Sequence, residues 1–160
     1  MAPEFGHNAC SIPESLMQEF PHHYSVAASA AVQGEVTLES ERLSPIGSAP
    51  PLEFGGPGDR WSPETLLVAA VVDCFILTFR GIAGASRLPW TSLSCDIVGT
   101  VERVDRVTQF TGFEIRARLR VPPGSNGDQA LRLLTKAEET CLVTNSLKVK
   151  PHLEATVETP

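Results

Sequence analysis

Four cysteines are the residues of this sequence with the most distinctive chemistry, and they stand at Cys10, Cys74, Cys95 and Cys141. A thiolate can attack a peroxide bond, become a sulfenic acid and condense with a second thiol to a disulfide. Four thiols spread over 160 residues are too few and too scattered for the disulfide scaffold of a secreted protein. A bond between any two of them is therefore expected to be catalytic or redox-sensing.

For each cysteine the alternative is simple packing, because a free cysteine often behaves as a small buried hydrophobe. Cys95 alternates with Leu93 and Ile97 in a strand pattern, which favours packing, and Cys10 lies in a stretch without periodicity. Cys74 and Cys141 both fall in apolar stretches with helical character. These two cysteines are the candidates for chemistry.

The helix that carries Cys74 has a clear beginning in the sequence. Ser62 can cap it, Pro63 suits the first helical position and Glu64 suits the positive end of the helix dipole. The helix is predicted to run to about Arg80 and is apolar on all sides, so we expect other protein segments to enclose it. Asp73 interrupts the apolar run before the ~20 residues that a membrane span requires. We therefore expect a buried central helix and no membrane association.

The other elements follow from alternation, helical spacing and turn residues. Residues 1–20 are interpreted as a loosely ordered arm and residues 21–160 as a single domain. Cys141 is seven residues after Leu134, so it is expected on the inward face of its helix. The expected order is strands at 24–32 and 36–38 joined by a turn at 33–35, a loop at 44–60, the first helix, strands at 93–104 and 113–121, a helix at 130–141 and a strand at 153–157.

The charge balance of the chain is acidic, with 13 Lys and Arg against 19 Asp and Glu and a net charge of -6. This balance argues against nucleic acid as a partner. Arg116, Arg118 and Arg120 are explained as the solvated face of an antiparallel sheet. The N-terminal stretch lacks the basic and apolar regions of a secretory signal, so a cytoplasmic protein is expected.

Two local motifs carry a family resemblance. Residues 62–70, Ser-Pro-Glu-Thr-Leu-Leu-Val-Ala-Ala, lead into Asp73-Cys74-Phe75, and residues 141–147 read Cys-Leu-Val-Thr-Asn-Ser-Leu. Together, and with the order of the predicted elements, they resemble the two cysteine motifs of the OsmC/Ohr family. The resemblance implies an α+β fold with antiparallel sheets around a buried central helix. It also implies an interlocked homodimer with two active sites at its interface.

The same resemblance implies a thiol-dependent peroxidase that reduces organic hydroperoxides in oxidative-stress defence. It makes Cys74 the cysteine that attacks the peroxide, Cys141 the resolving cysteine and Glu64 the active-site glutamate. An external dithiol would reduce the resulting disulfide, and neither a cofactor nor a metal is expected.

The chain departs from the family pattern at two places. The family's first hairpin supplies an arginine, whereas residues 33–35 here are Gln-Gly-Glu. Arg60, four residues before Glu64, is our candidate substitute, with Arg42 as the other choice. The family's second motif has proline after its cysteine, where this chain has Leu142.

Helix geometry gives a separate argument about assembly. Glu64 and Cys74 are ten residues apart, which is ~15 Å of rise along one helix. The two side chains cannot share a site on one helix, so if both act in one site, one of them comes from a partner subunit. The peroxidase hypothesis with Glu64 therefore requires a dimer.

Three alternatives remain open. The protein could be a non-catalytic relative that binds a small hydrophobic ligand or senses redox state at the dimer interface. His22 and His23 could join Cys74 and Cys141 in a zinc site, because thiolate and imidazole suit that metal. A Cys-His hydrolase could use His22 or His152 as its base.

Overall fold

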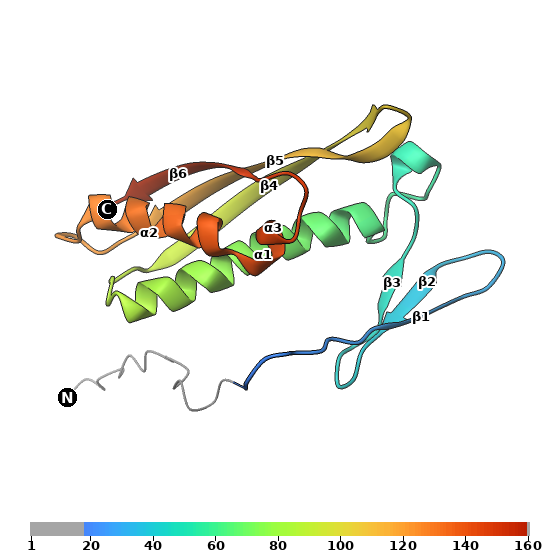
Figure 1. Ribbon diagram of the computed structural model, residues 1–160, viewed down its shortest axis with the longest axis horizontal. Helices are drawn as coiled ribbons and strands as arrows, with labels where there is room; N and C mark the ends of the chain where they lie inside the picture. Colours follow the sequence, from blue (N-terminus) through green and yellow to red (C-terminus); the bar gives the residue numbers. More distant parts are fainter. Residues whose placement is uncertain (1–17, 160) are drawn as a thin grey trace, which may run out of the picture. The chain divides into compact units, whose positions relative to one another are not determined.

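The computed structural model describes residues 18–159. Contacts within the chain divide these residues into two compact units, 18–70 and 71–159 (Figure 1). Most of the predicted N-terminal arm, residues 1–17 with Cys10, lies outside the described residues. The assignment of residues 21–160 to a single domain stays a prediction.

The unit of residues 18–70 is built on a small antiparallel sheet of three strands in the order β1-β2-β3. The strands are β1 (Ala27–Ala30), β2 (Val36–Glu39) and β3 (Ile46–Ser48), followed by the short 3₁₀ helix η2 (Leu52–Phe54). The predicted hairpin is present, with Ala30 opposite Val36. The predicted loop at 44–60 contains β3 and η2, which was missed because three residues between Pro45 and Pro50 are too few to show a period.

The helix α1 (Pro63–Ala85) begins as the sequence predicts. The Ser62 hydroxyl accepts a hydrogen bond from the Thr65 backbone N–H at 3.2 Å. The helix is five residues longer than expected, because Gly81 and Gly84 do not interrupt it. It stops where Arg87 takes a left-handed backbone conformation with φ 51° and the Leu88 N–H bonds the Ala83 carbonyl at 3.0 Å.

The burial of α1 differs from the prediction of a helix enclosed on all sides. Only one stripe is fully buried, formed by Val71, Phe75, Phe79 and Ala83 at intervals of four residues. Leu77, on another side of the helix, is 51% exposed. By length and composition α1 is also the one helix of the described residues that could span a bilayer. Outside the stripe, the other described residues cover the apolar side chains of α1 only in part.

The unit of residues 71–159 contains a three-stranded sheet in the order β4-β5-β6. Strands β4 (Ser92–Val104) and β5 (Val107–Arg120) form a long antiparallel hairpin. Strand β6 (His152–Glu158) pairs with β5 in parallel, with Glu114 opposite His152. The expectation of antiparallel sheets is therefore wrong for this pair, because the helical segment between β5 and β6 carries the chain back to the starting end of β5.

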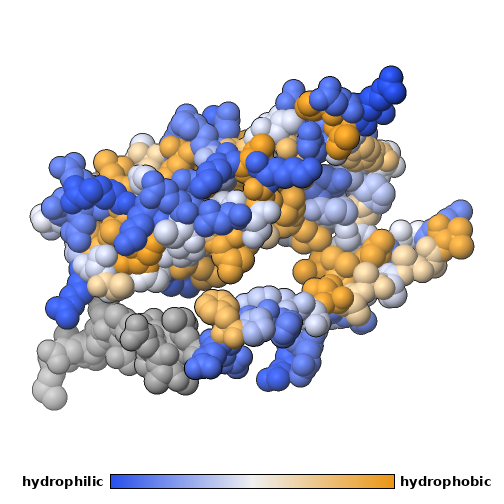
Figure 2. All heavy atoms as spheres, in the orientation of Figure 1, coloured by the Kyte–Doolittle hydropathy of each residue, from blue (hydrophilic) through white to orange (hydrophobic). Residues whose placement is uncertain are grey.

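The alternation predicted for β5 is confirmed. Phe113, Ile115, Ala117 and Leu119 are 2% exposed or less and form the core. The arginines of the opposite face are each paired with a carboxylate, Arg118 with Asp96 at 3.0 Å, Arg116 with Glu154 at 3.3 Å and Arg120 with Glu158 at 3.1 Å. These pairs account for the three arginines, and Figure 2 shows strongly hydrophilic side chains over this part of the molecule.

Two helices connect β5 to β6. Helix α2 (Gly127–Thr140) is capped by Asn126, whose side chain accepts from the Gln129 N–H at 2.9 Å. Its buried residues are Ala130, Leu134 and Ala137, and the short helix α3 (Leu142–Asn145) follows directly. Within this unit α2 and the end of α1 run along one side of the sheet (Figure 1). The edge of the Phe79 ring meets the Trp90 ring there, with centroids 5.6 Å apart.

Candidate functional site

The structure brings Cys74 and Cys141 together. Cys74 lies midway along α1 and is half-buried, whereas Cys141 is fully buried at the junction of α2 and α3. Both thiols are free, and they lie close enough for each to shift the pKa of the other. Two cysteines from separate helices thus form one pair, with the more accessible sulfur on α1.

The position of Cys141 is set by a tight turn between the two helices. Cys141 has extended backbone angles, φ -62° and ψ 120°, which end α2 and begin α3. The Thr144 hydroxyl, which is buried, donates within this turn to the Cys141 carbonyl at 3.0 Å. The Asn145 N–H also bonds the Cys141 carbonyl at 3.0 Å. These bonds fix the backbone of Cys141, the predicted resolving cysteine, beside Cys74.

The two thiols have opposite acidities. Burial acts to raise the pKa of Cys74, but hydrogen bonds from the Cys141 thiol, the Val143 N–H, the Thr78 hydroxyl and the Leu142 N–H outweigh it, and the net pKa is lowered. Burial and the hydrogen bond with Cys74 raise the pKa of Cys141. Cys74 is therefore the thiol that ionises first, and Cys141 keeps its proton.

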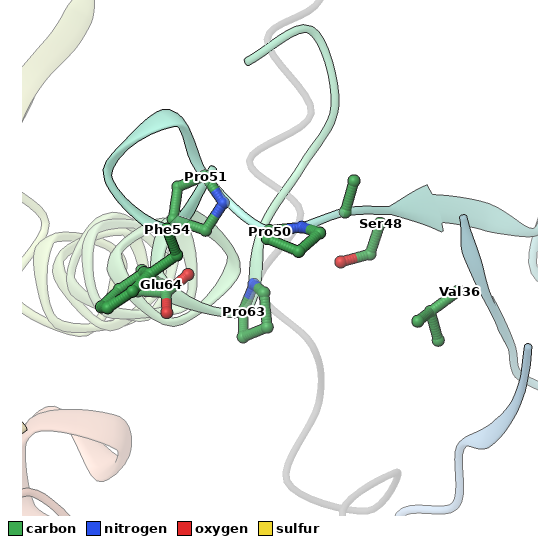
Figure 3. Close-up of a pocket in the computed structure, with 8 residues that line it drawn as sticks. Val36, Ser48, Pro50, Pro51, Phe54, Pro63 and Glu64 are labelled. Atoms are coloured by element: carbon green, nitrogen blue, oxygen red, sulfur yellow. The ribbon is translucent and has the colours of Figure 1, made fainter. Parts of the chain in front are cut away.

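Glu64 lies in the other unit, beside an apolar pocket of about 250 Å³ (Figure 3). The Phe54 ring lies next to its carboxylate in that view. The atom Oε2 of Glu64 is buried and has no hydrogen-bond partner among the described residues. An uncompensated carboxylate oxygen in apolar surroundings is costly, so this site favours a donor from outside the unit. The pocket is lined by Val36, Ser48, Ala49, Pro50, Pro51, Phe54, Pro63 and Glu64.

Arg60, which we predicted to act beside Glu64, is paired with two other acids in the structure. Its guanidinium bonds Glu35 of the first hairpin at 2.5 Å and Asp59 at 3.1 Å. The hydrogen bond with Glu35, followed by the charge of Asp59, raises the pKa of Arg60, so this side chain stays cationic. The hairpin therefore contributes an acid that pairs with Arg60. Arg42, the other arginine considered, pairs with its neighbour Glu41 at 3.2 Å.

Glu64 and Cys74 are not joined by any hydrogen bond between described residues. They lie on α1 with the ten-residue separation noted above. Their membership of one active site, and the catalytic roles of Cys74, Cys141, Glu64 and Arg60, stay predictions.

The other candidate centres receive less support. Over residues 18–159 no group of three or more His, Cys, Asp or Glu side chains is arranged to hold a metal ion. The ring of His22 bonds the Gln18 carbonyl at 2.8 Å. Burial, with a smaller effect of Asp96, raises the pKa of Cys95 to about 11, so that thiol is inert at neutral pH. Cys95 is therefore a packing residue.

Three groups around Cys74 were missed in the sequence. Thr78 lies one helical turn after Cys74, with its hydroxyl oxygen 3.9 Å from the sulfur. The spacing of four residues on a predicted helix is a signal that would have found it. The backbone N–H groups of Leu142 and Val143, which help to lower the pKa of Cys74, carry no signal in residue type.

Comparison with known proteins identifies the family. Residues 56–156, which contain both cysteines of the pair, match the family model described as OsmC-like protein. The chain belongs to the OsmC-like family. Among curated proteins it is 32% identical to the uncharacterized protein YmaD of Bacillus subtilis strain 168, over 76% of this chain and 84% of YmaD.

Solved structures of OsmC-like proteins share the fold. An OsmC-like protein of unknown function from Vibrio cholerae has a TM-score of 0.78 at 19% identity, and covers 85% of this chain and 100% of its own. An organic hydroperoxide resistance protein OsmC from Legionella pneumophila has a TM-score of 0.69 at 22% identity, and covers 87% of this chain and 98% of its own. The α+β, OsmC-like fold expected from the sequence is confirmed.

Proposed function

We propose that this OsmC-like protein is a thiol-dependent peroxidase that reduces organic hydroperoxides through a Cys74–Cys141 cycle. The observation that carries the proposal is the pair of neighbouring free thiols, in which the pKa of Cys74 is lowered and that of Cys141 is raised. A nucleophile that ionises easily beside a protonated second thiol is the arrangement that a two-cysteine peroxidase needs. The names of relatives such as the Legionella pneumophila hydroperoxide resistance protein agree with it.

The proposed cycle balances atoms and electrons in three steps. The Cys74 thiolate attacks the outer oxygen of the hydroperoxide, the O–O bond breaks, and the alkoxide leaves as an alcohol after taking a proton. The sulfenic acid on Cys74 then condenses with the Cys141 thiol, which forms the disulfide and releases water. An external dithiol reduces the disulfide by exchange and is itself oxidised. No cofactor enters the cycle.

A homodimer is part of this proposal. The apolar sides of α1 outside its buried stripe need cover, and Leu77 is one of the residues they expose. The hairpin unit also exposes large apolar residues, among them Val26 and Val32, and Figure 2 shows apolar atoms at the surface of the β1–β2 hairpin. A second copy of the chain could cover both surfaces and bring its Glu64 to the first copy's Cys74. We place the dimer in the cytoplasm.

Steady-state turnover tests the proposed function. Purified protein with cumene hydroperoxide and excess dithiothreitol should consume the peroxide, and hydrogen peroxide should be consumed more slowly. Cys74→Ser should lose turnover, while Cys95→Ser should retain it because Cys95 is outside the pair. In a separate incubation without dithiothreitol, Cys141→Ser should react once and then stall at a sulfenic acid, seen as a gain of about 16 Da. Equal consumption by wild type and Cys74→Ser would contradict the proposal.

A second candidate function is the binding of a small ligand or redox sensing without turnover. The buried, unpartnered oxygen of Glu64 beside an apolar pocket favours binding of a molecule with an apolar body and a hydrogen-bond donor. Native mass spectrometry of the purified protein distinguishes the two functions. A retained small molecule together with thiols that do not react with peroxide would support binding.

A further inference from the structure

An ion pair in the unit of residues 18–70 connects two segments that are far apart in the sequence. The Arg60 guanidinium donates to Oε1 of Glu35 at 2.5 Å, across a separation of 25 residues. Arg60 also pairs with Asp59 at 3.1 Å, so two acids share its charge. Glu35 stands just before β2, and Arg60 stands in the loop before α1. The pair therefore links the turn of the first hairpin to the segment that leads into the helix.

The strand register explains why β3 has a glycine beside this ion pair. Gly47 is opposite Thr37 of β2. Side chains two residues apart on a strand point to the same face, so Glu35 lies on the face of Thr37 and Gly47. A Cβ atom at Gly47 would overlap Oε2 of Glu35. The missing side chain thus leaves the space that the Glu35 carboxylate occupies while it pairs with Arg60.

The opposite face of the same strands lines the pocket beside Glu64. Val36 and Ser48 are opposite each other in the register, and both line that pocket (Figure 3). Ser48 also forms an isolated parallel bridge with Trp61. Because Arg60 immediately precedes Trp61, the ion pair lies next to the connection between the sheet and the start of α1.

We propose that Glu35 and Arg60, paired over Gly47, form a clamp that holds the first hairpin to the start of α1 and thereby fixes the lining of the pocket beside Glu64. The clamp is a conformational device of the folded chain, and its effect on the pocket does not depend on peroxidase activity. It gives Arg60 a role that needs no direct contact with Glu64.

The clamp acts locally, because its charges are only partly buried. The side chains of Arg60 and Glu35 are 44% and 43% exposed, and ion pairs with such exposure change an equilibrium by about fivefold or less. The backbone connection that the clamp supports is also short, since the bridge to Trp61 is accompanied by a hydrogen bond from the Ala49 N–H to the Trp61 carbonyl at 2.8 Å. A modest interaction should therefore alter how often this connection opens, with little effect on global unfolding.

Two changes break the clamp in different ways, and each has a matched control. Glu35→Gln keeps the size of the side chain and removes its charge, whereas Glu41→Gln removes an acid that pairs with its own neighbour Arg42. Gly47→Ala adds a methyl group that displaces the Glu35 carboxylate. In a Glu35→Ala background no carboxylate is left to displace, so Gly47→Ala in that background measures any other effect of the glycine.

Amide hydrogen exchange, followed by peptide mass spectrometry, measures how often the clamped segments open. The wild type and the variants are compared in peptides from residues 36–49 and 59–66. Glu35→Gln and Gly47→Ala should each make exchange in these peptides about two- to fivefold faster. Glu41→Gln should match the wild type, and Gly47→Ala should give no further increase in the Glu35→Ala background.

The outcomes separate this inference from the proposed function. Exchange at the wild-type rate in both Glu35→Gln and Gly47→Ala would overturn the clamp. An equal effect of Gly47→Ala with and without the Glu35 side chain would also overturn it, because the glycine would then act alone. If circular dichroism shows that Gly47→Ala does not fold, the comparison of Glu35→Gln with Glu41→Gln decides the result. Faster exchange in the clamp variants of a protein that never consumes peroxide would support the clamp and overturn only the peroxidase.

Discussion

At the scale of single residues, the protein distinguishes three cysteines by their surroundings. Cys74 receives several hydrogen bonds, Cys141 is buried beside it, and Cys95 lies in a strand next to Asp96. These surroundings fit the roles that we propose, with Cys74 as the nucleophile and Cys141 as the resolving thiol, and they fit Cys95 as a packing residue. The proposed difference in reactivity follows the general rule that thiolate character controls the reactivity of a cysteine.

This difference predicts the order in which the thiols react as the pH rises. The lowered pKa of Cys74 means that its alkylation should begin below the pH at which an ordinary thiol reacts, and it should decline as the pH falls through that pKa. Cys95, with a pKa of about 11, should stay unmodified at pH 8 and react only as the pH approaches that value. Iodoacetamide labelling with peptide mass spectrometry checks this order. Faster labelling of Cys95 than of Cys74 at pH 8 would contradict it.

The sequence predicted part of this site and not the rest. Cys74, Cys141 and Glu64 stood out through their motifs, and the pairing of the first two follows from the fold. In the structure Arg60 is paired with Glu35 and Asp59, and its role beside Glu64 stays a prediction. Sequence spacing does not show whether an arginine will pair with an acid of the hairpin turn, such as Glu35, or with one of α1, such as Glu64.

At the scale of the elements, local sequence signals predicted some features of the fold, whereas the features that depend on long-range packing were not predicted. The start of α1 and the alternation of β5 were both correct, since capping and period are local properties. The predictions for the end of α1 and for the pairing of β6 were wrong, because these features depend on packing and on the path of the connecting helices. Strand β3 was missed because it is only three residues long and lies between Pro45 and Pro50.

The buried stripe of α1 should dominate the stability of its unit. Phe79→Ala removes a fully buried ring that meets Trp90, and we expect it to lower the free energy of unfolding by about 3–5 kcal/mol. Leu131→Ala, at a position of α2 that is 39% exposed, should cost less than about 1 kcal/mol. Urea unfolding followed by circular dichroism measures both. Equal losses in the two variants would contradict the assignment of the core.

At the scale of the whole molecule, the chain leaves more apolar surface open than a monomer needs. Helix α1 buries only one of its sides, and the hairpin unit exposes several large apolar residues. Large exposed apolar patches mark contacts with other molecules. A second copy is the partner that we propose, because the proposed cycle needs a Glu64 from one chain beside a Cys74 of another.

A charge placed on the open side of α1 should separate the proposed dimer. We expect Leu77→Glu to shift the protein from dimer to monomer in size-exclusion chromatography with light scattering, because burying an unpaired carboxylate in an apolar contact is unfavourable. Thr135→Glu adds the same charge at an exposed position of α2 and should stay dimeric. A monomeric wild type, or a Leu77→Glu variant that remains dimeric, would contradict this account of the assembly.

The most direct test of the central claim is a single-turnover titration of the thiols. One equivalent of cumene hydroperoxide is added to the reduced protein, followed by thiol counting, intact mass and disulfide mapping. The account predicts the rapid loss of two thiols and about 2 Da per chain, with a disulfide between Cys74 and Cys141 and no reaction in Cys74→Ser. Unchanged thiols and mass in the wild type would contradict it.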